Sequence, residues 1–187
     1  MDAIVAQGIE AGGHRGSFIE GEPLPQVGLM SLVPQIVDQV SVPVIAAGGI
    51  FDHRTIKAAF ALGAMGVQLG SYFLAADESA ATQVYKEQAL LATDTSTELT
   101  LAFTGKWARG IRNSFMEEIK NANLAMPPYT FQNSLTTALR NFGKSNAIAD
   151  IISLWAGQSV SKSKRGSTEE LFHELIHQLQ INPNPIF

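Results

Sequence analysis

Residues 42–50, Val-Pro-Val-Ile-Ala-Ala-Gly-Gly-Ile, join a short apolar run to two consecutive glycines. A run of this length between turn signals is typical of a strand buried on both faces, as in a parallel sheet. A helical pattern follows over residues 52–62, with Asp52 as the expected N-cap and Gly63 as the C-terminal stop. The segment therefore predicts a strand, a tight turn and a helix.

The glycine pair suggests a binding site at that turn. Gly48 and Gly49 carry no Cβ, so a ligand can lie directly against the main chain. The free N–H groups of the next helix would face this ligand and would favour an anion such as phosphate. Taken alone, two glycines fit an ordinary strand-to-helix turn better, so the phosphate hypothesis depends on the neighbouring stretches.

The neighbouring stretches repeat the same alternation of strand and helix. Strands are expected at residues 3–7, 43–47 and 66–69, and helices at 29–40, at 52–62 and from near residue 72. This order predicts parallel strands with crossover helices, in an α/β sheet or barrel. Ligands gather at the C-terminal ends of such strands, where the glycines of residues 12–16, 48–49 and 70–71 all fall.

The pattern changes to a mainly helical one after residue 79. Helices are expected at residues 79–92, 114–122, 131–142, 146–156 and 168–180, with a loop over 93–100 and a mobile linker over 159–167. In the last helix, His173-Glu-Leu-Ile-His177 matches the zinc-protease pattern His-Glu-x-x-His in letters. Because its leucines account for a packing helix and no third ligand is evident, the structural interpretation is favoured.

Composition excludes several classes of protein. The net charge of -4 argues against nucleic acid as the main partner. The absence of cysteine excludes thiol catalysis, disulfides and thiolate metal sites. No apolar stretch is long enough to span a bilayer, and the first residues, Met-Asp-Ala-Ile-Val, lack the basic segment of a signal peptide. A cytoplasmic protein without a membrane partner is expected.

Three glycine-containing motifs carry a family resemblance. Gln7-Gly-Ile-Glu-Ala-Gly-Gly-His-Arg-Gly16, Pro43-Val-Ile-Ala-Ala-Gly-Gly-Ile50 and Gly66-Val-Gln-Leu-Gly-Ser71 closely resemble the nitronate monooxygenase family, formerly called 2-nitropropane dioxygenases. Residues 104–113 and 154–158 are similar to the C-terminal portion of that family. Its members are FMN-dependent (β/α)8 barrels with an added, mainly helical domain. The likeness runs over nearly the whole chain.

The resemblance implies a fold and a division of the chain. The implied fold class is α/β, the C-terminal portion of a (β/α)8 TIM barrel with three parallel strands, plus a mainly helical region. These strands would be barrel strands six, seven and eight. Residues 1–78 would form the partial FMN-binding barrel, and residues 79–187 the helical C-terminal region.

The resemblance also implies the chemistry. FMN would be the cofactor, and an alkyl nitronate and dioxygen would yield a carbonyl compound and nitrite. His14 would act as base toward nitroalkanes or as partner to the anionic nitronate, which suits a side chain whose pKa lies near neutrality. The implied cofactor-binding residues are Gln7 and Gly12 near the isoalloxazine and ribityl groups, and Gly48, Gly49, Gln68, Leu69, Gly70 and Ser71 around the phosphate.

One departure from the family pattern limits these implications. Family members carry about five further strand–helix units before the point that matches the start of this chain, and three strands do not close a barrel. The outer strands would keep unpaired edges. Two outcomes stay open: the chain folds around three strands plus helices, or it associates with another chain, as a homo-oligomer or with a complementing N-terminal chain, that covers the edge. Two alternatives stay open: a truncated, non-catalytic remnant that binds FMN or phosphate weakly, and a flavin-dependent enoyl-acyl-carrier-protein reductase.

The other charged residues near the motifs each allow a functional and a structural interpretation. Arg15 either attracts the anionic substrate or lies on the surface, and Glu10 either orients its loop or caps a backbone N–H. A solvated face is favoured over a basic rim for Lys106, Arg109 and Arg112, and His53 is expected to be structural.

Overall fold

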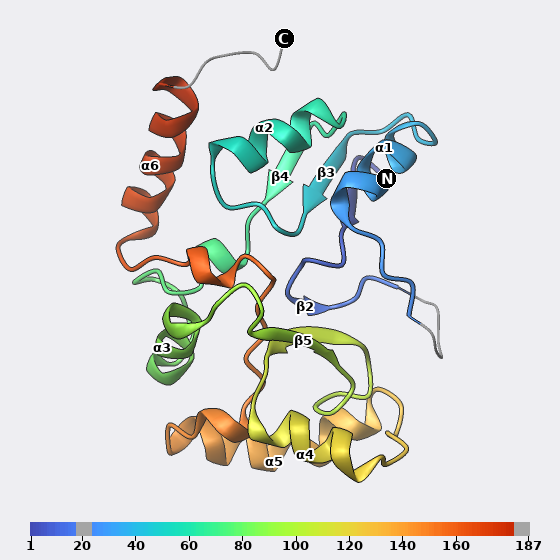
Figure 1. Ribbon diagram of the computed structural model, residues 1–187, viewed down its shortest axis with the longest axis vertical. Helices are drawn as coiled ribbons and strands as arrows, with labels where there is room; N and C mark the ends of the chain where they lie inside the picture. The colour runs from blue at the N-terminus through green and yellow to red at the C-terminus, as the bar shows by residue number, and fades with distance from the viewer. Residues whose placement is uncertain (18–23, 182–187) are drawn as a thin grey trace.

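The first of two sheets is parallel and has three strands (Figure 1). The computed structural model describes residues 1–17 and 24–181. Strands β1 (Ile4–Gln7), β3 (Val44–Ala47) and β4 (Gly66–Gln68) lie in the order β1-β3-β4. Gln7 is in register with Ala47, and Ala47 with Gln68, so the three strands end together. The prediction of three parallel strands is confirmed.

Helices α1 (Leu29–Val37) and α2 (His53–Ala61) make the crossovers between these strands. Helix α1 begins where expected but ends three residues before the predicted limit of residue 40. The main core contains Val33 from α1, Ala46 from β3 and Ile56 from α2, all almost fully buried. Helix α6 (Thr168–Ile181) packs against α2, and its Leu171 and Leu175 join the same core. Apolar burial on these faces is the main favourable term that holds the sheet and its helices together.

The start and end of α2 follow from three residues. Asp52 Oδ1 accepts hydrogen bonds from the backbone N–H groups of Arg54 (3.1 Å) and Thr55 (3.0 Å). Thr55 Oγ1 in turn accepts from the N–H of Asp52 at 3.0 Å, which completes a capping box. Gly63 has a φ of 98° just after the helix, where a side chain would be strained. The predicted cap and stop are both confirmed.

The second sheet is antiparallel and was not expected from the sequence. Strands β2 (Gly13–His14), β5 (Thr97–Thr100) and β6 (Ala108–Ile111) lie in the order β2-β6-β5. The loop predicted over residues 93–100 is therefore wrong for its second half. Polar residues in β5 and an arginine and a glycine in β6 hid the strand pattern, although every residue of β6 is buried. Strand β2 carries His14, the residue that the sequence predicts to be catalytic.

The helix predicted over residues 146–156 is also wrong. Only one 3₁₀ turn, η2 (Ala149–Ile151), is present, and an extended segment follows. Ile152, Leu154 and Ala156 are buried at alternate positions, the period of an extended chain. The backbone N–H of Ile111 donates to the Leu154 carbonyl at 2.8 Å, so the segment runs beside β6.

The expected linker over residues 159–167 is packed against the rest of the molecule. Within it, the 3₁₀ turn η3 (Val160–Lys162) buries Val160 completely. The Ser163 hydroxyl, also buried, donates a hydrogen bond to the Ser71 carbonyl. The helix expected from residue 72 is instead a single 3₁₀ turn, η1 (Ser71–Phe73).

Three more helices complete the described chain. They are α3 (Gln83–Leu91), α4 (Ser114–Ala122) and α5 (Phe131–Ser145), and Figure 1 shows α4 and α5 at the end of the molecule remote from the parallel sheet. The pairing of β2 with β6 and the packing of α6 on α2 both link residues 1–78 to residues after 78. None of the helices in the described ranges is long and apolar enough to cross a membrane.

The extended segment after η2 gives a first test of the fold. Leu154 is 1% exposed, so Leu154→Ala should lower the free energy of unfolding by about 2–5 kcal/mol. Leu91 is 76% exposed, and Leu91→Ala should change it by no more than about 0.5 kcal/mol. Urea unfolding of both variants measures the difference. Equal shifts of the two midpoints would show that residues 152–156 do not pack as described.

Candidate functional site

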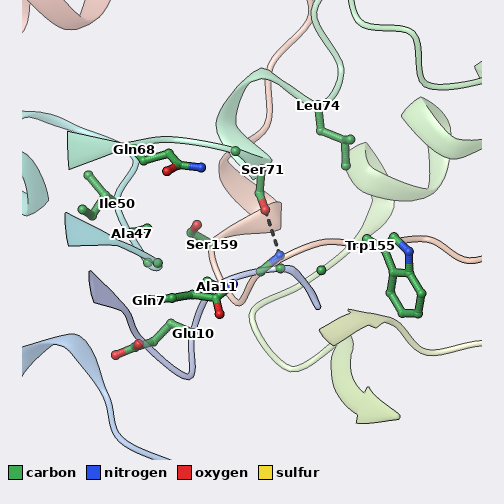
Figure 2. A pocket seen from close by; sticks show the side chains of 16 residues that line it. Gln7, Glu10, Ala11, Ala47, Ile50, Gln68, Ser71, Leu74, Trp155 and Ser159 are labelled. Carbon is green, nitrogen blue, oxygen red and sulfur yellow. Dashed lines mark hydrogen bonds between the residues drawn. The ribbon is translucent and has the colours of Figure 1, made fainter. Parts of the chain in front are cut away.

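A cavity of about 300 Å³ lies at the C-terminal ends of β1, β3 and β4 (Figure 2). The last residue of each strand lines it, and so does the turn that follows. Residues 155–159 add a fourth side from a distant part of the chain. The lining residues are Gln7, Glu10, Ala11, Gly12, Gly13, Ala47, Gly48, Gly49, Ile50, Gln68, Gly70, Ser71, Leu74, Trp155, Gly157 and Ser159.

The cavity brings together nearly all the residues that the sequence singled out as cofactor-binding. Gln7, Gly12, Gly48, Gly49, Gln68, Gly70 and Ser71 all line it. Leu69 does not, because its side chain packs against the main core. The three glycine turns therefore meet at one edge of the parallel sheet, as the shared strand direction predicts.

The turn after β3 requires glycine for two reasons. Gly48 and Gly49 have φ angles of 126° and 66°, which residues with a Cβ rarely adopt. A Cβ on Gly48 would also lie 3.0 Å from the backbone nitrogen of Ala11. At Gly70, by contrast, a Cβ would meet no other atom within 4 Å, so open space faces that residue. A ligand can reach the main chain there.

Residues 155–159 are the part of the site that sequence reasoning missed. A Cβ on Gly12 would lie 2.6 Å from the carbonyl carbon of Ala156, and one on Gly157 would lie 2.6 Å from the carbonyl oxygen of Glu10. The two glycines therefore allow two backbones to touch. The N–H of Gly157 donates to Ser71 Oγ at 2.8 Å, which ties the segment to the turn after β4. The signal available in the sequence was the spacing of Ile152, Leu154 and Ala156 at every second position before Gly157, which is the period of an extended chain.

His14 lies beside the cavity rather than in its lining. Its ring is 5.4 Å from the Trp155 ring and 6.2 Å from the Tyr129 ring, and its Nε2 lies 2.9 Å from Thr104 Oγ1. Trp155 lines the cavity, so it joins the two regions. Gln7 Nε2 donates to the His14 carbonyl at 2.9 Å, which holds the histidine backbone against β1.

Burial and nearby positive charge keep the His14 ring neutral. Its pKa is lowered from the ordinary value of 6.5, first because the half-buried ring is poorly solvated and then because Lys106, Arg15 and Arg140 repel a second positive charge. A neutral imidazole has a lone pair that can accept a proton. The arrangement suits a general base more than a permanent cation.

Arg15 fits neither of its expected roles. It is 6% exposed, and its guanidinium donates to the carbonyl oxygens of Gly8, Gly12 and Gly13 at 3.0–3.3 Å. Burial, then repulsion from Arg109, lowers the pKa of Arg15 to about 10, while Glu10 opposes this. Arg15 is therefore still charged at neutral pH and holds the glycine-rich loop in shape from inside. It does not face a substrate.

Glu10 is a lining residue whose charge is directed away from the cavity. Its carboxylate accepts from the backbone N–H of Leu29 at 2.9 Å, at the start of α1. It also lies near the cations of Arg15 and Arg109, whose pKa values it raises. The capping role, one of its two expected roles, is confirmed. Because the Glu10 carboxylate is bound to the Leu29 N–H and lies near two cations, it repels an anionic ligand in the cavity less than a free carboxylate would.

The basic residues of residues 104–113 do not form a rim. Arg109 is 6% exposed and donates to the Ile9 carbonyl at 2.9 Å, so it lies on neither a rim nor a solvated face. Arg112 is exposed and donates to the Thr95 carbonyl. Lys106 acts on His14 through its charge. The three cations therefore interact with three different segments of the chain.

The His-Glu-x-x-His segment is part of a packing helix. His173 is exposed and lies 3.8 Å from Glu169, whereas Leu171 and Leu175 are buried in the main core. In the ranges 1–17 and 24–181, no group of three or more potential ligand residues is placed to hold a metal ion. His53, at the start of α2, is a further lone histidine.

The sequence matches one family model over most of its length. Residues 1–178 match the model described as nitronate monooxygenase. A probable nitronate monooxygenase from Bacillus subtilis (strain 168) is 49% identical over 180 residues, which are 96% of this chain and 51% of the relative. One from Staphylococcus aureus (strain Newman) is 46% identical over 180 residues with the same shares. The chain therefore spans about half the length of the curated relatives it matches.

Two solved structures share the fold. A nitroalkane oxidase from Streptomyces ansochromogenes superposes with a TM-score of 0.91 at 36% identity, over 97% of this chain and 52% of that one. FabK from Thermotoga maritima superposes with a TM-score of 0.79 at 30% identity, over 97% of this chain and 55% of that one. Each likeness covers 97% of this chain but only about half of the other protein.

The environment of His14 gives a test by pH. An NMR titration should place its pKa below 6.5, and Lys106→Gln should raise that pKa by removing one of its causes. Since the unfolded chain then binds the proton more readily, the contribution of His14 to stability is present above pH 6.5 and is lost as the pH falls toward the folded-state pKa. His14→Gln should remove this part of the pH dependence of unfolding. A His14 pKa at or above 6.5 would contradict the described surroundings.

Proposed function

The chain belongs to the nitronate monooxygenase family, and from this we propose that it binds FMN in the cavity and oxidises alkyl nitronates with dioxygen. The products are a carbonyl compound and nitrite. The observation that carries the proposal is the meeting of three glycine turns at one cavity that adjoins a neutral histidine.

The residues present suit the phosphate end of FMN. Gly70 leaves the main chain accessible, because its Cβ direction points into open space, whereas the Cβ direction of Gly48 meets Ala11. Ser71 Oγ accepts from Gly157, so its own hydrogen can be donated to a phosphate oxygen. The nearest carboxylate, Glu10, is turned toward α1. The cavity volume of about 300 Å³ lies at the small end of ligand sites.

We also propose the barrel position of the parallel sheet. The strands β1, β3 and β4 correspond to strands six, seven and eight of a (β/α)8 barrel. Their order, their shared direction and the likeness to the nitroalkane oxidase structure support this. Phosphate sites in such barrels lie after strands seven and eight, which matches the turns at Gly48 and Gly70.

His14 is proposed as the proton-transfer residue. FMN, when bound, supplies the electron acceptor of the oxidation. The Thr104 hydroxyl donates to the Lys106 carbonyl at 3.1 Å. Its oxygen accepts the Lys106 N–H at 3.4 Å and keeps a second lone pair for the Nε2–H of His14. This leaves the lone pair on Nδ1, which can take a proton from the carbon beside a nitro group. Thr104 thus selects the tautomer and acts as a positioning residue.

Cofactor binding is tested at Gly70. Its φ of -102° is allowed for any residue and a Cβ there has no close neighbour, so both variants should fold. Gly70→Asp places a carboxylate against the phosphate and should weaken FMN binding roughly tenfold or more. Gly70→Ala adds no charge and should bind FMN much more tightly than Gly70→Asp. Quenching of FMN fluorescence measures both. A wild-type chain that takes up no FMN would contradict the proposal.

Activity is tested by nitrite release from a neutral nitroalkane, which still carries the proton on the carbon beside the nitro group that His14 would remove. In the FMN-loaded chain, His14→Gln should lower the rate by about 10²–10⁴-fold, the usual contribution of a general base. Thr104→Val should cause a smaller loss and shift the pH profile, because the tautomer is no longer selected. His173→Gln, at a 72% exposed side chain on α6, is the matched control and should change nothing.

The two alternatives have distinct outcomes in the same assay. NADH consumption without nitrite would favour an enoyl-acyl-carrier-protein reductase. FMN uptake without turnover of either substrate would favour a non-catalytic remnant.

A further inference from the structure

Helix α5 has its polarity reversed relative to an ordinary surface helix. Phe131, Leu135 and Phe142 are 68%, 70% and 58% exposed. Gln132 and Thr136, each about 100° further around the helix than the residue before it, are 6% and 5% exposed. An amphipathic surface helix normally buries its apolar face and exposes its polar one. The apolar face of α5 is therefore unpartnered in the described molecule.

The polar face is held inside by specific contacts. Gln132 Nε2 donates to the Ala102 carbonyl at 2.6 Å, and Thr136 Oγ1 donates to the Phe103 carbonyl at 2.6 Å. Gly143 lets the helix lie directly against Ile152, since a Cβ would be 2.7 Å from that side chain. Rotating α5 to bury its phenylalanines would leave two buried carbonyls unpaired, which costs free energy. The exposed face is thus a consequence of the fold.

The exposed apolar residues are spaced for packing against another helix. Phe131, Leu135, Ala138 and Phe142 are four, three and four residues apart, and all are exposed. This is the seam of a coiled coil, in which apolar residues recur every 3.5 residues on average. We call these four residues the α5 seam. The matching occupant of a straight apolar seam is a second helix.

We propose that the α5 seam pairs with the α5 seam of a second copy of this chain, antiparallel about a two-fold axis. With the axis between Thr136 and Thr137, Phe131 faces Phe142 of the partner subunit. Leu135 then faces Ala138 of the partner subunit, so a large side chain meets a small one. The seam is self-complementary, as a two-fold interface requires.

Charge does not oppose this pairing. The seam itself is neutral, and Ser134 and Asn141 flank it. Arg140 is turned to Asn133 and Thr136 of its own helix, with its NH2 group 2.8 Å from Asn133 Oδ1. No two like charges face each other in the register given by the two-fold axis. Charged residues are depleted at the centre of protein interfaces, which matches this arrangement.

The exposed area is sufficient for a weak dimer. The three large seam residues together expose on the order of 380 Å², taking about 200 Å² for each whole side chain. Two copies would bury roughly 750 Å² of apolar surface, and since interfaces are about 60% apolar the total would be roughly 1,200 Å². That total lies at the lower limit of specific interfaces. Dimerisation in the micromolar range is expected.

The test is the mass of the 187-residue chain in solution, by light scattering over a range of concentrations. The wild-type chain should be a dimer at about 100 µM and dissociate on dilution. Leu135→Lys should give a monomer with unchanged circular dichroism. Leu91→Lys, at another highly exposed leucine, should leave the dimer intact. A monomeric wild-type chain, or a dimer that Leu135→Lys does not change, would overturn the proposal.

Crosslinking tests the register independently. Because the chain has no cysteine, each introduced cysteine is the only thiol. Chains with Leu135→Cys mixed with chains with Ala138→Cys should form a mixed disulfide faster than either forms one with itself. Equal or absent crosslinking would exclude the antiparallel register. The seam residues do not line the cavity, so this result is independent of FMN binding.

Discussion

The contact between Gly12 and Gly157 joins the two parts of this molecule. Each glycine lies against the backbone of the other's segment, at a separation that a Cβ would not allow. The Gln158 N–H donates to the Glu10 carbonyl at 2.9 Å and keeps the two segments in register. One segment follows β1 and the other is the extended stretch beside β6. The cavity exists because these two backbones meet over the turns that follow β3 and β4.

The same contact sets the position of the proposed base. The loop between β1 and β2 is held by Arg15 from within, by Gln7 at the His14 carbonyl and by residues 156–157 from outside. With its backbone fixed on three sides, His14 presents its ring to Thr104 and Trp155. Burial of the His14 ring is the first cause that lowers its pKa, and the charges of Lys106, Arg15 and Arg140 add to it. Of these three cations, Arg15 is the one that also donates to the backbone carbonyls of the loop. Arg15 therefore both supports the loop and lowers the pKa of His14.

Buried polar side chains donate to backbone carbonyls both at the site and beneath α5. At the site, buried Arg15 holds the glycine-rich loop through the carbonyls of Gly8, Gly12 and Gly13. At α5, Gln132 and Thr136 satisfy the carbonyls of Ala102 and Phe103 and turn the apolar face outward. An exposed apolar stripe of this size is normally covered by a partner. The proposed association thus follows from how the region after β5 satisfies its backbone.

The sequence alone determined the local features of the first half. The strand lengths, the cap at Asp52, the stop at Gly63 and the glycine turns depend on neighbouring residues, and parallel strands with a common end follow from their alternation with helices. The tertiary structure decided the rest. Strand β6 holds an arginine and a glycine, which hide its strand pattern. Residues 152–156, predicted as helix, are extended and bury every second residue. Thr104 and Trp155 join His14 across 90 and 141 residues of chain, and such distant pairings leave no local pattern to read.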